Sequence, residues 1–435
     1  MRGVLRAAVL ASTAAVALSG CAGGGGGGTS DVLSEGGWPG RYSDARNSST
    51  ATADGLDDLS AAWARPLGGR VGSPAGVARN GQIAVTASTD AGCNLFSFQI
   101  DNGRKRWCTR LAPGATTVTP VSDGNANIYV GEDGGMFSFN EHGQRRWRIP
   151  VSGTPRSAQF ASDGKLVVVT HFGQVNIINP QTGQLVAPLF DLVPIPAVGD
   201  GQNVPRLASD HGLPACFGGS PDCPVATTPA VDLATDRIFV TLWRPGADRA
   251  SLVAMRYTSG DNASVVEEWS TDDLPGGAVT SPVLSADGAT VYVHDGDGTL
   301  WAVDSTTGTP RWSHRLDYSP ATGPAVTGDG LLLLAAGGDE GALTALRDNG
   351  DGAEMVWQRT DVTQHAVPAV TSNGLGYSIV GGADGLAALV FDSSDGHSID
   401  EEPITEATGF PVGTAVGPDG EFVATTHGGD VVVLR

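Results

Sequence analysis

The sequence predicts an all-β protein: an eight-bladed β-propeller of four-stranded antiparallel blades, closed by an N-terminal strand that completes the last blade. Three observations support this prediction. A unit of about 43 residues recurs along the chain, Gly-bearing turns separate short alternating strands within each unit, and no convincing helix of three or more turns follows residue 30. Short four-stranded units repeated around an axis are typical of propellers, because one blade cannot bury both of its faces alone.

The composition of the 435-residue chain agrees with a large, turn-rich body. Gly contributes 62 residues, roughly twice the usual share, and charged residues make up only 17%. The glycines occur in pairs and clusters rather than at every third position, which excludes collagen, and the shortage of Lys excludes a long coiled coil. Acidic residues outnumber basic residues 47 to 26, and the net charge of −21 argues against binding to nucleic acids.

Residues 1–20 have the pattern of a bacterial lipoprotein signal peptide. Two arginines precede an apolar run over 7–17, which is too short to span a bilayer but has the length of a secretory signal core. The run leads into Leu-Ser-Gly-Cys at 18–21, which resembles the lipobox, where the chain is cut before the Cys and lipid is attached to its thiol. We therefore expect lipidation at Cys21; the alternative is an ordinary signal peptide with an incidental Cys.

Residues 21–37 are expected to form a flexible tether. Six consecutive glycines at 23–28 formally match the dinucleotide-binding pattern G-x-G-x-x-G, but no strand precedes them and no helix follows. The folded body over 38–435 would then be lipid-anchored to a cell membrane on its extracytoplasmic face. In a Gram-negative cell, the Ala after Cys21 favours the periplasmic face of the outer membrane.

A Pro opens each repeated unit. The intervals between successive anchors are 46, 35, 74, 53, 42, 44 and 43 residues. The long interval holds one unit and an insertion, which we place at 193–226, between blades 3 and 4. The anchors are Pro74, Pro120, Pro155, Pro229, Pro282, Pro324, Pro368 and Pro411.

The two ends of the repeat region predict how the ring closes. The last unit stops at 431–435 with its third strand, whereas Ala-Ala-Trp-Ala at 61–64 precedes the first unit as an orphan fourth strand. A Trp recurs on the expected outer strands, where a large ring can pack on the next blade. These blade-docking tryptophans are Trp63, Trp107, Trp147, Trp269, Trp312 and Trp357.

One copy of the unit shows a family resemblance. Residues 302–312 read Ala-Val-Asp-Ser-Thr-Thr-Gly-Thr-Pro-Arg-Trp and resemble the A-x-D-x-x-T-G-x-x-x-W docking motif of propellers of the pyrroloquinoline-quinone (PQQ) type. Residues 179–183 and 98–107 are weaker copies, and the segment that begins at Trp38 is similar to the opening segment of the same families. The resemblance covers about residues 38–435 and implies the propeller fold.

The resemblance leads to two branches with different functions. The branch of BamB, a lipoprotein of the β-barrel assembly machinery, implies a monomeric, non-enzymatic protein-binding scaffold of the cell envelope, with an unidentified envelope protein as partner and no cofactor. The quinoprotein branch implies a small oxidoreductase that uses PQQ and Ca²⁺, the ion being held by Glu, Asn and Asp. The chain has no adjacent cysteine pair and no calcium set that we can assign, and it is shorter than the usual enzymes. We therefore favour the scaffold; a carbohydrate or peptidoglycan binder is a weaker third possibility.

Four cysteines remain after the anchor, and four allow three pairings. Cys93 and Cys108 flank a hairpin predicted to turn at 101–103, and Cys216 and Cys223 lie seven residues apart within the insertion. We favour these two pairs, as expected for an exported protein. A metal site is the alternative, but there is no C-x-x-C and no His at a zinc-ligand spacing, so no metal is predicted.

Catalytic motifs are missing from the sequence. It contains no G-x-S-x-G, no H-E-x-x-H and no P-loop Lys. The Asp-Gly loops at 295–298 and 348–352 lack the ligand set of an EF-hand, and Asp-Gly is favoured in hairpin turns for its backbone conformation alone. We predict no catalytic residue.

The candidate binding face is the one that carries the insertion. Long loops on rigid scaffolds often bind partners, and this one opens with an apolar run that looks exposed; shielding of the channel mouth is the equal alternative. Trp243 follows a predicted strand at 238–242 and is expected near the same mouth, where it either stacks on a ligand or caps the channel.

Histidines add to this candidate face. Three of them fall at equivalent turns between the second and third strands of blades 3, 5 and 8, and a fourth begins the inner strand of blade 7. Because blades 3, 5 and 8 are not adjacent, we interpret these histidines as polar turn residues rather than as a metal or acid–base cluster. The candidate face residues are Val193, Pro194, Ile195, Pro196, Trp243, His171, His294, His365 and His427.

Overall fold

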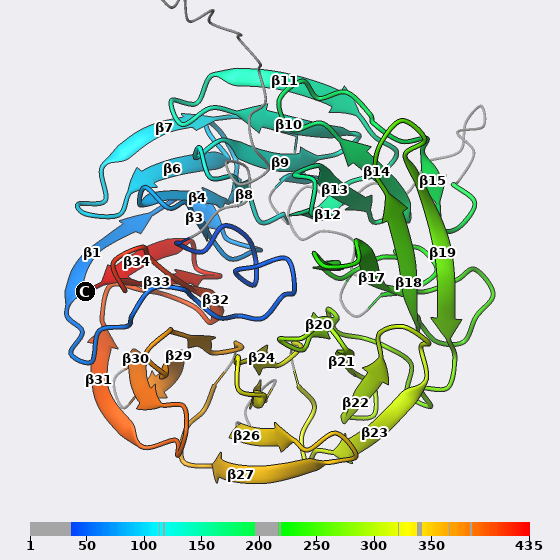
Figure 1. Ribbon diagram of the computed structural model, residues 1–435. Coiled ribbons are helices and arrows are strands. Elements are labelled where there is room, and N and C mark those ends of the chain that lie inside the picture. Colours follow the sequence, from blue (N-terminus) through cyan, green and yellow to red (C-terminus); the bar gives the residue numbers. More distant parts are fainter. Residues whose placement is uncertain are drawn as a thin grey trace, which may run out of the picture.

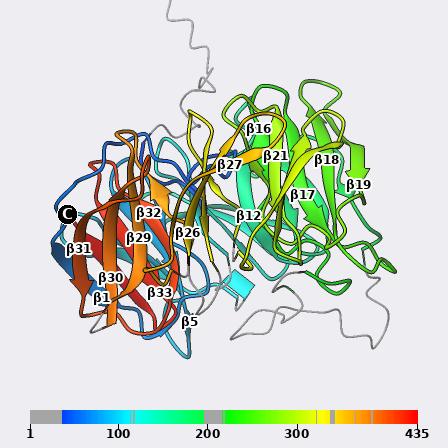
Figure 2. The ribbon, with the colours of Figure 1, turned by 90° about the horizontal axis from the view of Figure 1, so that it is seen from below.

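Eight four-stranded sheets form the blades of a ring around a central axis (Figure 1). The structure is a computed structural model, which describes residues 36–112, 114–115, 118–195, 216, 219–320, 322–336, 342–364, 366–382 and 385–435. Neighbouring strands in each blade are antiparallel, and the strands run between the two faces of the ring (Figure 2). The predicted all-β, eight-bladed propeller is confirmed.

The first four blades each take four strands in chain order, from the axis to the rim, and blade 1 omits β5 (Ser88–Thr89). They are β3 (Gly76–Val77), β4 (Gln82–Thr86), β6 (Leu95–Gln99) and β7 (Lys105–Thr109); β8 (Val121–Ser122), β9 (Ile128–Glu132), β10 (Gly135–Phe139) and β11 (Arg145–Pro150); β12 (Pro155–Phe160), β13 (Leu166–Thr170), β14 (Gln174–Ile178) and β15 (Phe190–Asp191); and β16 (Ala230–Asp232), β17 (Arg237–Leu242), β18 (Ser251–Thr258) and β19 (Ser264–Thr271). A small extra sheet pairs β2 (Gly69–Arg70) with β5 (Ser88–Thr89).

The other four blades follow the same order. They are β20 (Val283–Leu284), β21 (Thr290–His294), β22 (Thr299–Asp304) and β23 (Pro310–Arg315); β24 (Ala325–Val326), β25 (Leu331–Ala335), β26 (Leu343–Asp348) and β27 (Ala353–Arg359); β28 (Ala369–Val370), β29 (Leu375–Gly382), β30 (Gly385–Asp392) and β31 (Ser398–Ile404); and β32 (Pro411–Val416), β33 (Phe422–Thr426), β34 (Asp430–Leu434) and β1 (Ala61–Pro66).

The N-terminal strand closes the ring, as the sequence predicts. β1 pairs antiparallel with β34, the last strand of the chain, so that Trp63 lies opposite Val433 and Pro66 opposite Asp430. Blade 8 therefore joins both ends of the repeat region, and separating its outer strand would break the main-chain bonds that hold the ring shut.

The middle strands of the blades form the core. All five residues of β13 (Leu-Val-Val-Val-Thr) are buried, as are all five of β25 (Leu-Leu-Leu-Leu-Ala). Continuous apolar runs suit these strands because each blade is covered on both faces by its neighbours. The outer strands alternate instead: β23 buries Trp312 between exposed neighbours.

Six tryptophans on outer strands dock on the next blade around the ring. In the blade 2 example, the indole N–H of Trp147 donates to the Pro180 carbonyl at 2.9 Å, and the ring covers Gly183. A Cβ at Gly183 would lie 2.8 Å from this ring, and the φ of Gly183 is +74°, so the turn needs glycine on both counts. The six indole N–H donors are those of Trp63, Trp107, Trp147, Trp269, Trp312 and Trp357.

A single segment, residues 38–51, lies inside the ring and contacts one blade after another; we call it the axial segment (dark blue in Figure 1). Backbone N–H groups of the inner strands donate to its carbonyls, at 2.6–3.0 Å. These bonds run from Ser122 to Pro39, Val231 to Ala45, Leu284 to Arg46, Val326 to Ser48 and Val370 to Ser49, and Trp38 pairs with Val77 through two bonds. The segment therefore links six of the blades through the main chain, and Asn47 adds blade 3 through its side chain.

No helix among the described residues is long and apolar enough to cross a membrane. Residues 1–35 lie outside the described part of the chain, and so does Cys21 with most of the expected tether.

Candidate functional site

The axial segment forms the floor of a pocket on one face of the ring. We call this the connection face, because it carries the connections from the outer strand of one blade to the inner strand of the next. The turns between the second and third strands lie on the same face: Ala278 in one connection bridges to Asp295 in such a turn, and Gln364 bridges to Val380. The axial segment runs through the centre of the ring, and the pocket opens above it at this face.

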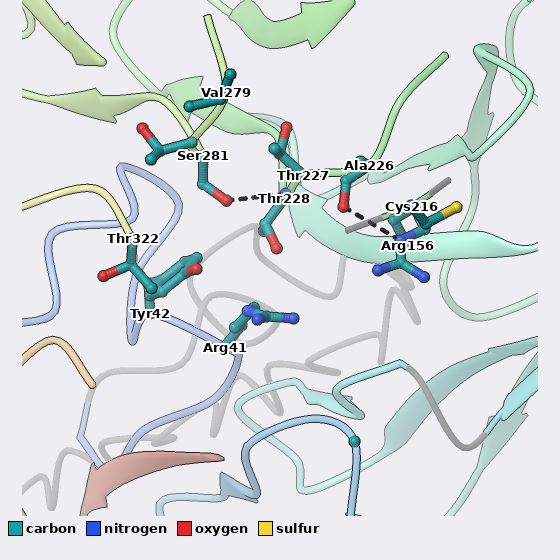
Figure 3. Close-up of a pocket in the computed structure, with 12 residues that line it drawn as sticks. Arg41, Tyr42, Arg156, Cys216, Ala226, Thr227, Thr228, Val279, Ser281 and Thr322 are labelled. Atoms are coloured by element: carbon teal, nitrogen blue, oxygen red, sulfur yellow. Dashed lines mark hydrogen bonds between the residues drawn. The ribbon is translucent and has the colours of Figure 1, made fainter. Parts of the chain in front are cut away.

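The pocket has a volume of about 190 Å³ and draws its walls from blades 3 to 6 and from the connection before blade 1. Figure 3 shows Arg41 and Tyr42 rising from the axial segment, with Arg156 opposite on the inner strand of blade 3. The lining residues are Arg41, Tyr42, Gly72, Arg156, Cys216, Ala226, Thr227, Thr228, Val279, Thr280, Ser281 and Thr322.

Two guanidinium groups, those of Arg41 and Arg156, line the pocket. Burial, and secondly the charge of Arg41, lower the pKa of Arg156 to about 10, and this group still carries its proton at neutral pH. The Nε of Arg156 donates to the Ala226 carbonyl at 3.3 Å. The guanidinium of Arg41 lies over the Tyr42 ring, 5.5 Å from its centre, and its buried Nε has no hydrogen-bond partner among the described residues.

Hydroxyl groups complete the wall opposite the floor. Ser281 Oγ accepts a hydrogen bond from the backbone N–H of Thr228 at 3.0 Å, which leaves the Ser281 hydroxyl hydrogen available as a donor. The side-chain oxygen of Thr228 is directed into the pocket (Figure 3). The pocket can therefore offer hydrogen-bond donors to a ligand from at least three blades.

The insertion borders this pocket through Cys216, which forms a disulfide with Cys223. Cys93 and Cys108 form a second disulfide across the hairpin of β6 and β7. Both predicted pairs are confirmed. Residues 196–215 and 217–218, including Pro196, lie outside the described residues.

The start of the insertion is less exposed than its sequence suggests. Val193 is only 5% exposed and packs in the core of blades 3 and 4, so the expectation of an exposed apolar run is wrong at this residue. Leu192 beside it is equally buried, and its backbone N–H donates to the Gly173 carbonyl, which pulls both side chains beneath the turn. Pro194 is exposed and Ile195 is half-buried.

Trp243 is half-buried beside the described end of the insertion. Its backbone N–H donates to the Pro224 carbonyl at 2.8 Å, and its indole N–H donates to the Ala247 carbonyl at 2.9 Å. The ring lies 3.9 Å from where a Cβ of Gly219 would be. Trp243 therefore holds the disulfide loop and its own turn, and it does not line the pocket.

Two of the predicted face histidines are interior groups. His171 is 1% exposed, and its Nδ1 accepts the backbone N–H of Thr154 at 2.8 Å. His294 is completely buried, and burial lowers its pKa to about 3, which keeps the imidazole neutral. The expectation that they emerge on the face is wrong because the connections cover these turns: Val225 and Val279 bond through their N–H groups to the carbonyls of the two histidines.

The remaining face residues are not gathered into a cluster. His427 is half-buried, and its ring stacks on exposed Phe410 with the centroids 4.6 Å apart. His365 lies outside the described residues. His171, His294, His427 and Trp243 do not line the pocket; of the predicted insertion, Cys216 and Ala226 do, and the other lining residues were not predicted as candidates.

Comparison with known proteins assigns the family. The model described as outer membrane protein assembly factor BamB matches residues 50–189 and 236–434. The chain belongs to this family. Protein Rv3035 of Mycobacterium tuberculosis is 39% identical over 401 residues, which cover 91% of this chain and 95% of the relative.

Solved structures share the fold of this BamB-family chain at low identity. BamB from Moraxella catarrhalis matches with a TM-score of 0.55 at 15% identity, covering 87% of this chain and 99% of that one. A europium-containing methanol dehydrogenase gives 0.61 at 14%, covering 92% and 98%. The quinohemoprotein alcohol dehydrogenase ADHIIG from Pseudomonas putida gives 0.62 at 14%, covering 92% and 80%. The predicted PQQ-like propeller is confirmed, and the fold is one that both BamB and PQQ-type dehydrogenases use.

The pocket does not fit the Ca²⁺ and PQQ of the quinoprotein branch. Ca²⁺ takes six to eight oxygen ligands, several of them carboxylates. The described lining contains no Asp or Glu and places two arginines there instead. The volume of about 190 Å³ is also below the range of about 300–1,000 Å³ typical of sites for larger ligands.

A possible cation site elsewhere is a surface turn. Asp392, Asp395 and His397 form the one group of three potential metal ligands found in the described ranges. Asp392 ends β30 and the other two lie on the exposed turn that follows, where Asp392 accepts the backbone N–H of Ser394 at 2.8 Å and Asp395 that of His397 at 3.0 Å. Both carboxylates thus have a role in shaping the turn, and the candidate cation site is empty.

The sequence did contain one signal for the pocket. Arg156 follows the anchor Pro155, whereas Ala or Val follows each of the other seven anchor prolines. Arg156 begins an inner strand near the axis and lines the pocket, where the other units have a small apolar residue that only packs. Arg41 gives no comparable signal, because its segment occurs once and has no repeat against which to compare it.

Proposed function

We propose that the chain is a non-enzymatic binding protein of the cell envelope. It is exported, held to the membrane by a lipid on Cys21, and presents its connection face to a protein partner. The observation that supports this most directly is at the axis: the axial segment runs through the centre of the ring, and the described lining of the pocket above it contains no Asp or Glu to bind Ca²⁺. The two disulfides agree with an oxidising compartment outside the cytoplasm.

The connection face is the side on which the chain departs from its repeat. It carries the insertion between β15 and β16, whose described end is tied by Cys216–Cys223 and packed on Trp243. Irregular loops on a rigid scaffold are the usual place for partner recognition. On the opposite face, docking tryptophans cover five of the turns between third and fourth strands.

The deciding experiment is a thermal-shift measurement on the mature full-length chain with PQQ, with Ca²⁺ and with both. We expect no rise of the melting temperature with both that exceeds the effect of each alone, and no dye-linked oxidation of alcohols or sugars. A quinoprotein dehydrogenase measured in parallel is the positive control. A joint stabilisation by PQQ and Ca²⁺ accompanied by turnover would replace this proposal with the quinoprotein alternative.

Anchoring is tested separately by fractionation of the cells that produce the protein. Cys21→Ala should move the chain from the membrane fraction to the soluble extracytoplasmic or culture fraction, because the thiol that receives the lipid is gone. Ser19→Ala is the matched control, since it keeps a small residue before the cleavage point and should leave the chain in the membrane. Membrane retention of both variants would contradict lipid anchoring at Cys21.

A further inference from the structure

The outer strands of blades 8, 1 and 2 form a basic stretch of the rim in an acidic protein. These strands, β1, β7 and β11, are neighbours around the ring (Figure 1), and Trp63 and Trp107 dock each of the first two on the next blade. The other five outer strands together hold seven acidic residues and only three Lys or Arg. The three strands, which we call the basic rim, contain no Asp or Glu and six basic residues: Arg65, Lys105, Arg106, Arg145, Arg146 and Arg148.

Most of this positive charge reaches solvent. Two members of the basic rim lie near carboxylates of adjoining segments, Arg106 at 3.5 Å from Glu141 and Arg148 at 3.4 Å from Glu132. With both pairs counted, the basic rim still has more positive than negative charge, and two exposed arginines flank β7. The exposed basic residues on and beside the basic rim are Arg65, Arg104, Lys105, Arg110, Arg145 and Arg148.

The basic rim offers charge without an apolar centre. The exposed large apolar side chains of the described chain, such as Val266, Met355 and Phe410, all lie outside β1, β7 and β11. The centre of a protein–protein interface is usually apolar and poor in charged residues. A broad surface of anionic phosphates, by contrast, attracts clustered Lys and Arg without needing apolar contacts. The composition of the basic rim therefore fits an anionic membrane surface better than a protein partner.

The start of the described chain lies at the same blades. Trp38 pairs with the inner strand of blade 1 through two main-chain bonds of 2.7 and 2.8 Å, and the Pro39 carbonyl accepts a main-chain bond from blade 2. Three strand spacings put an outer strand about 15 Å from the inner strand of its blade. About fifteen residues separate Cys21 from Gly36, and a Gly-rich coil of that length spans roughly 20 Å. A lipid on Cys21 can therefore reach the membrane surface that the basic rim would contact.

We infer that the basic rim binds the anionic headgroups of the membrane, so that the propeller stands on edge with blades 8, 1 and 2 against the bilayer. The net negative charge of the chain does not prevent this, because charges more than about 8 Å away are largely screened at physiological ionic strength. This orientation leaves the connection face open to a partner. The inference rests on the proposed export and anchoring for its setting, but its test does not need the lipid.

The test is co-sedimentation with lipid vesicles, using the mature full-length chain with Cys21→Ala so that no lipid anchor contributes. Vesicles of phosphatidylcholine alone are compared with vesicles that also contain about 30% phosphatidylglycerol, whose headgroup is anionic. We expect binding to the anionic vesicles only, and its loss when the salt rises from about 0.05 M to about 0.5 M, because salt screens the attraction. A high-salt wash removes this contribution from the cell fractionation described above, so anchoring and rim binding fail separately.

Two double variants locate the binding. Lys105→Gln/Arg145→Gln removes one exposed charge from β7 and one from β11. Each Lys or Arg near an anionic membrane strengthens binding about fivefold, so this variant should bind at least about tenfold more weakly. Arg311→Gln/Arg315→Gln on β23, across the ring in Figure 1, changes the net charge equally and should bind as wild type does. Melting temperatures of both variants show whether the fold is kept.

Three results would overturn the inference. The first is the absence of any preference for anionic over neutral vesicles at low salt. The second is an equal loss of binding in Arg311→Gln/Arg315→Gln, which would indicate a general effect of net charge. The third is a Lys105→Gln/Arg145→Gln chain that binds vesicles normally but loses self-association or a complex with an acidic protein, which would make the basic rim a protein-binding surface.

Discussion

Two sets of contacts hold the blades together, the docking tryptophans at the rim and the axial segment at the centre, and they are built in opposite ways. At the rim, six tryptophans each dock on the following blade: five indole N–H groups donate to a main-chain carbonyl and that of Trp312 to the Asp348 carboxylate, and in five of the six a glycine lies under the indole ring. At the axis, one segment of non-repeated sequence contacts the blades in turn through its own carbonyls. The rim contacts are side-chain contacts repeated from blade to blade, whereas the axial contacts are mainly main-chain hydrogen bonds of one segment.

This difference decides how many blades each set of contacts can join. A rim contact fixes only two neighbouring blades, so its loss is local. The axial segment contacts seven of the blades, and it brings non-repeated side chains such as Arg41 to the pocket without disturbing the repeat. The stabilising rim contacts are thus spread around the propeller, while the polar pocket groups are concentrated at the axis.

The largest expected effect is at the rim. Trp147→Ala should lower the free energy of unfolding by about 3–5 kcal/mol, because it removes a buried ring and opens a cavity over Gly183. Urea unfolding followed by intrinsic fluorescence measures the change. Trp243→Ala is the matched control and should cost less, since Trp243 is only half-buried and docks on no neighbouring outer turn. Equal losses would mean that docking on the next blade adds nothing to burial.

At the axis, Asn47→Ala should cost about 2–3 kcal/mol, since it leaves buried polar groups unpaired. The Asn47 amide donates to the carbonyls of Thr228, Pro229 and Pro282 at 2.9–3.2 Å, and its oxygen accepts from Gln159 at 2.9 Å.

The φ of Asn47 is +59°, so Asn47→Gly separates the side-chain bonds from the backbone strain. Glycine should recover about 1 kcal/mol of the loss relative to alanine. Urea unfolding measures both variants. A glycine variant as unstable as the alanine variant would show that the left-handed backbone at this position costs nothing.

The sequence predicted the rim well and the axis poorly, for one physical reason. Contacts that recur in six blades give the sequence a period. The tryptophans, their glycine turns and the strand that completes blade 8 could all be predicted from that period. The axial segment bonds through carbonyls, which any residue supplies. Its left-handed positions include Ser43, Asn47 and Ser49 rather than glycine, so they give no clear turn signal either.

The candidate face shows the same limit from the other side. Repeat position correctly placed His171 and His294 at strand-end turns, but it could not show that the connecting loops bury them. Arg156 was detectable as an exception to the repeat, because its neighbours in the other units are Ala and Val. Interaction between Arg41 and Arg156 needs the fold, since they lie far apart in the sequence.

A pH experiment examines the buried His294 of blade 5, which belongs neither to the rim contacts nor to the axial segment. The pKa of His294 is lowered from 6.5 to about 3 by burial. Between these values the unfolded chain binds a proton that the folded chain does not, so stability falls as the pH decreases from about 6.5 toward 3. At pH 5 this contribution is about 2 kcal/mol relative to neutral pH.

The variant His294→Leu removes that contribution, so its unfolding free energy should fall less between pH 7 and pH 5 than that of wild type. The pH dependence is compared rather than the absolute stability, because the substitution also changes packing. Urea unfolding at the two pH values gives both differences. Parallel pH profiles for the variant and the wild type would show that His294 is protonated in the folded chain.

The smallest expected effect is the coupling free energy between the rim contacts and the axial segment. Trp147 contacts Pro180, Gly183 and Tyr129, whereas Asn47 contacts Gln159 and the carbonyls before blades 4 and 5, so the two share no partner. Substitutions without shared partners usually add to within about 0.3–0.5 kcal/mol. The double variant Trp147→Ala/Asn47→Ala should therefore lose the sum of the two single losses, measured by urea unfolding. A coupling free energy above about 1 kcal/mol would mean that the tryptophan ring and the axial segment stabilise the propeller as one cooperative unit.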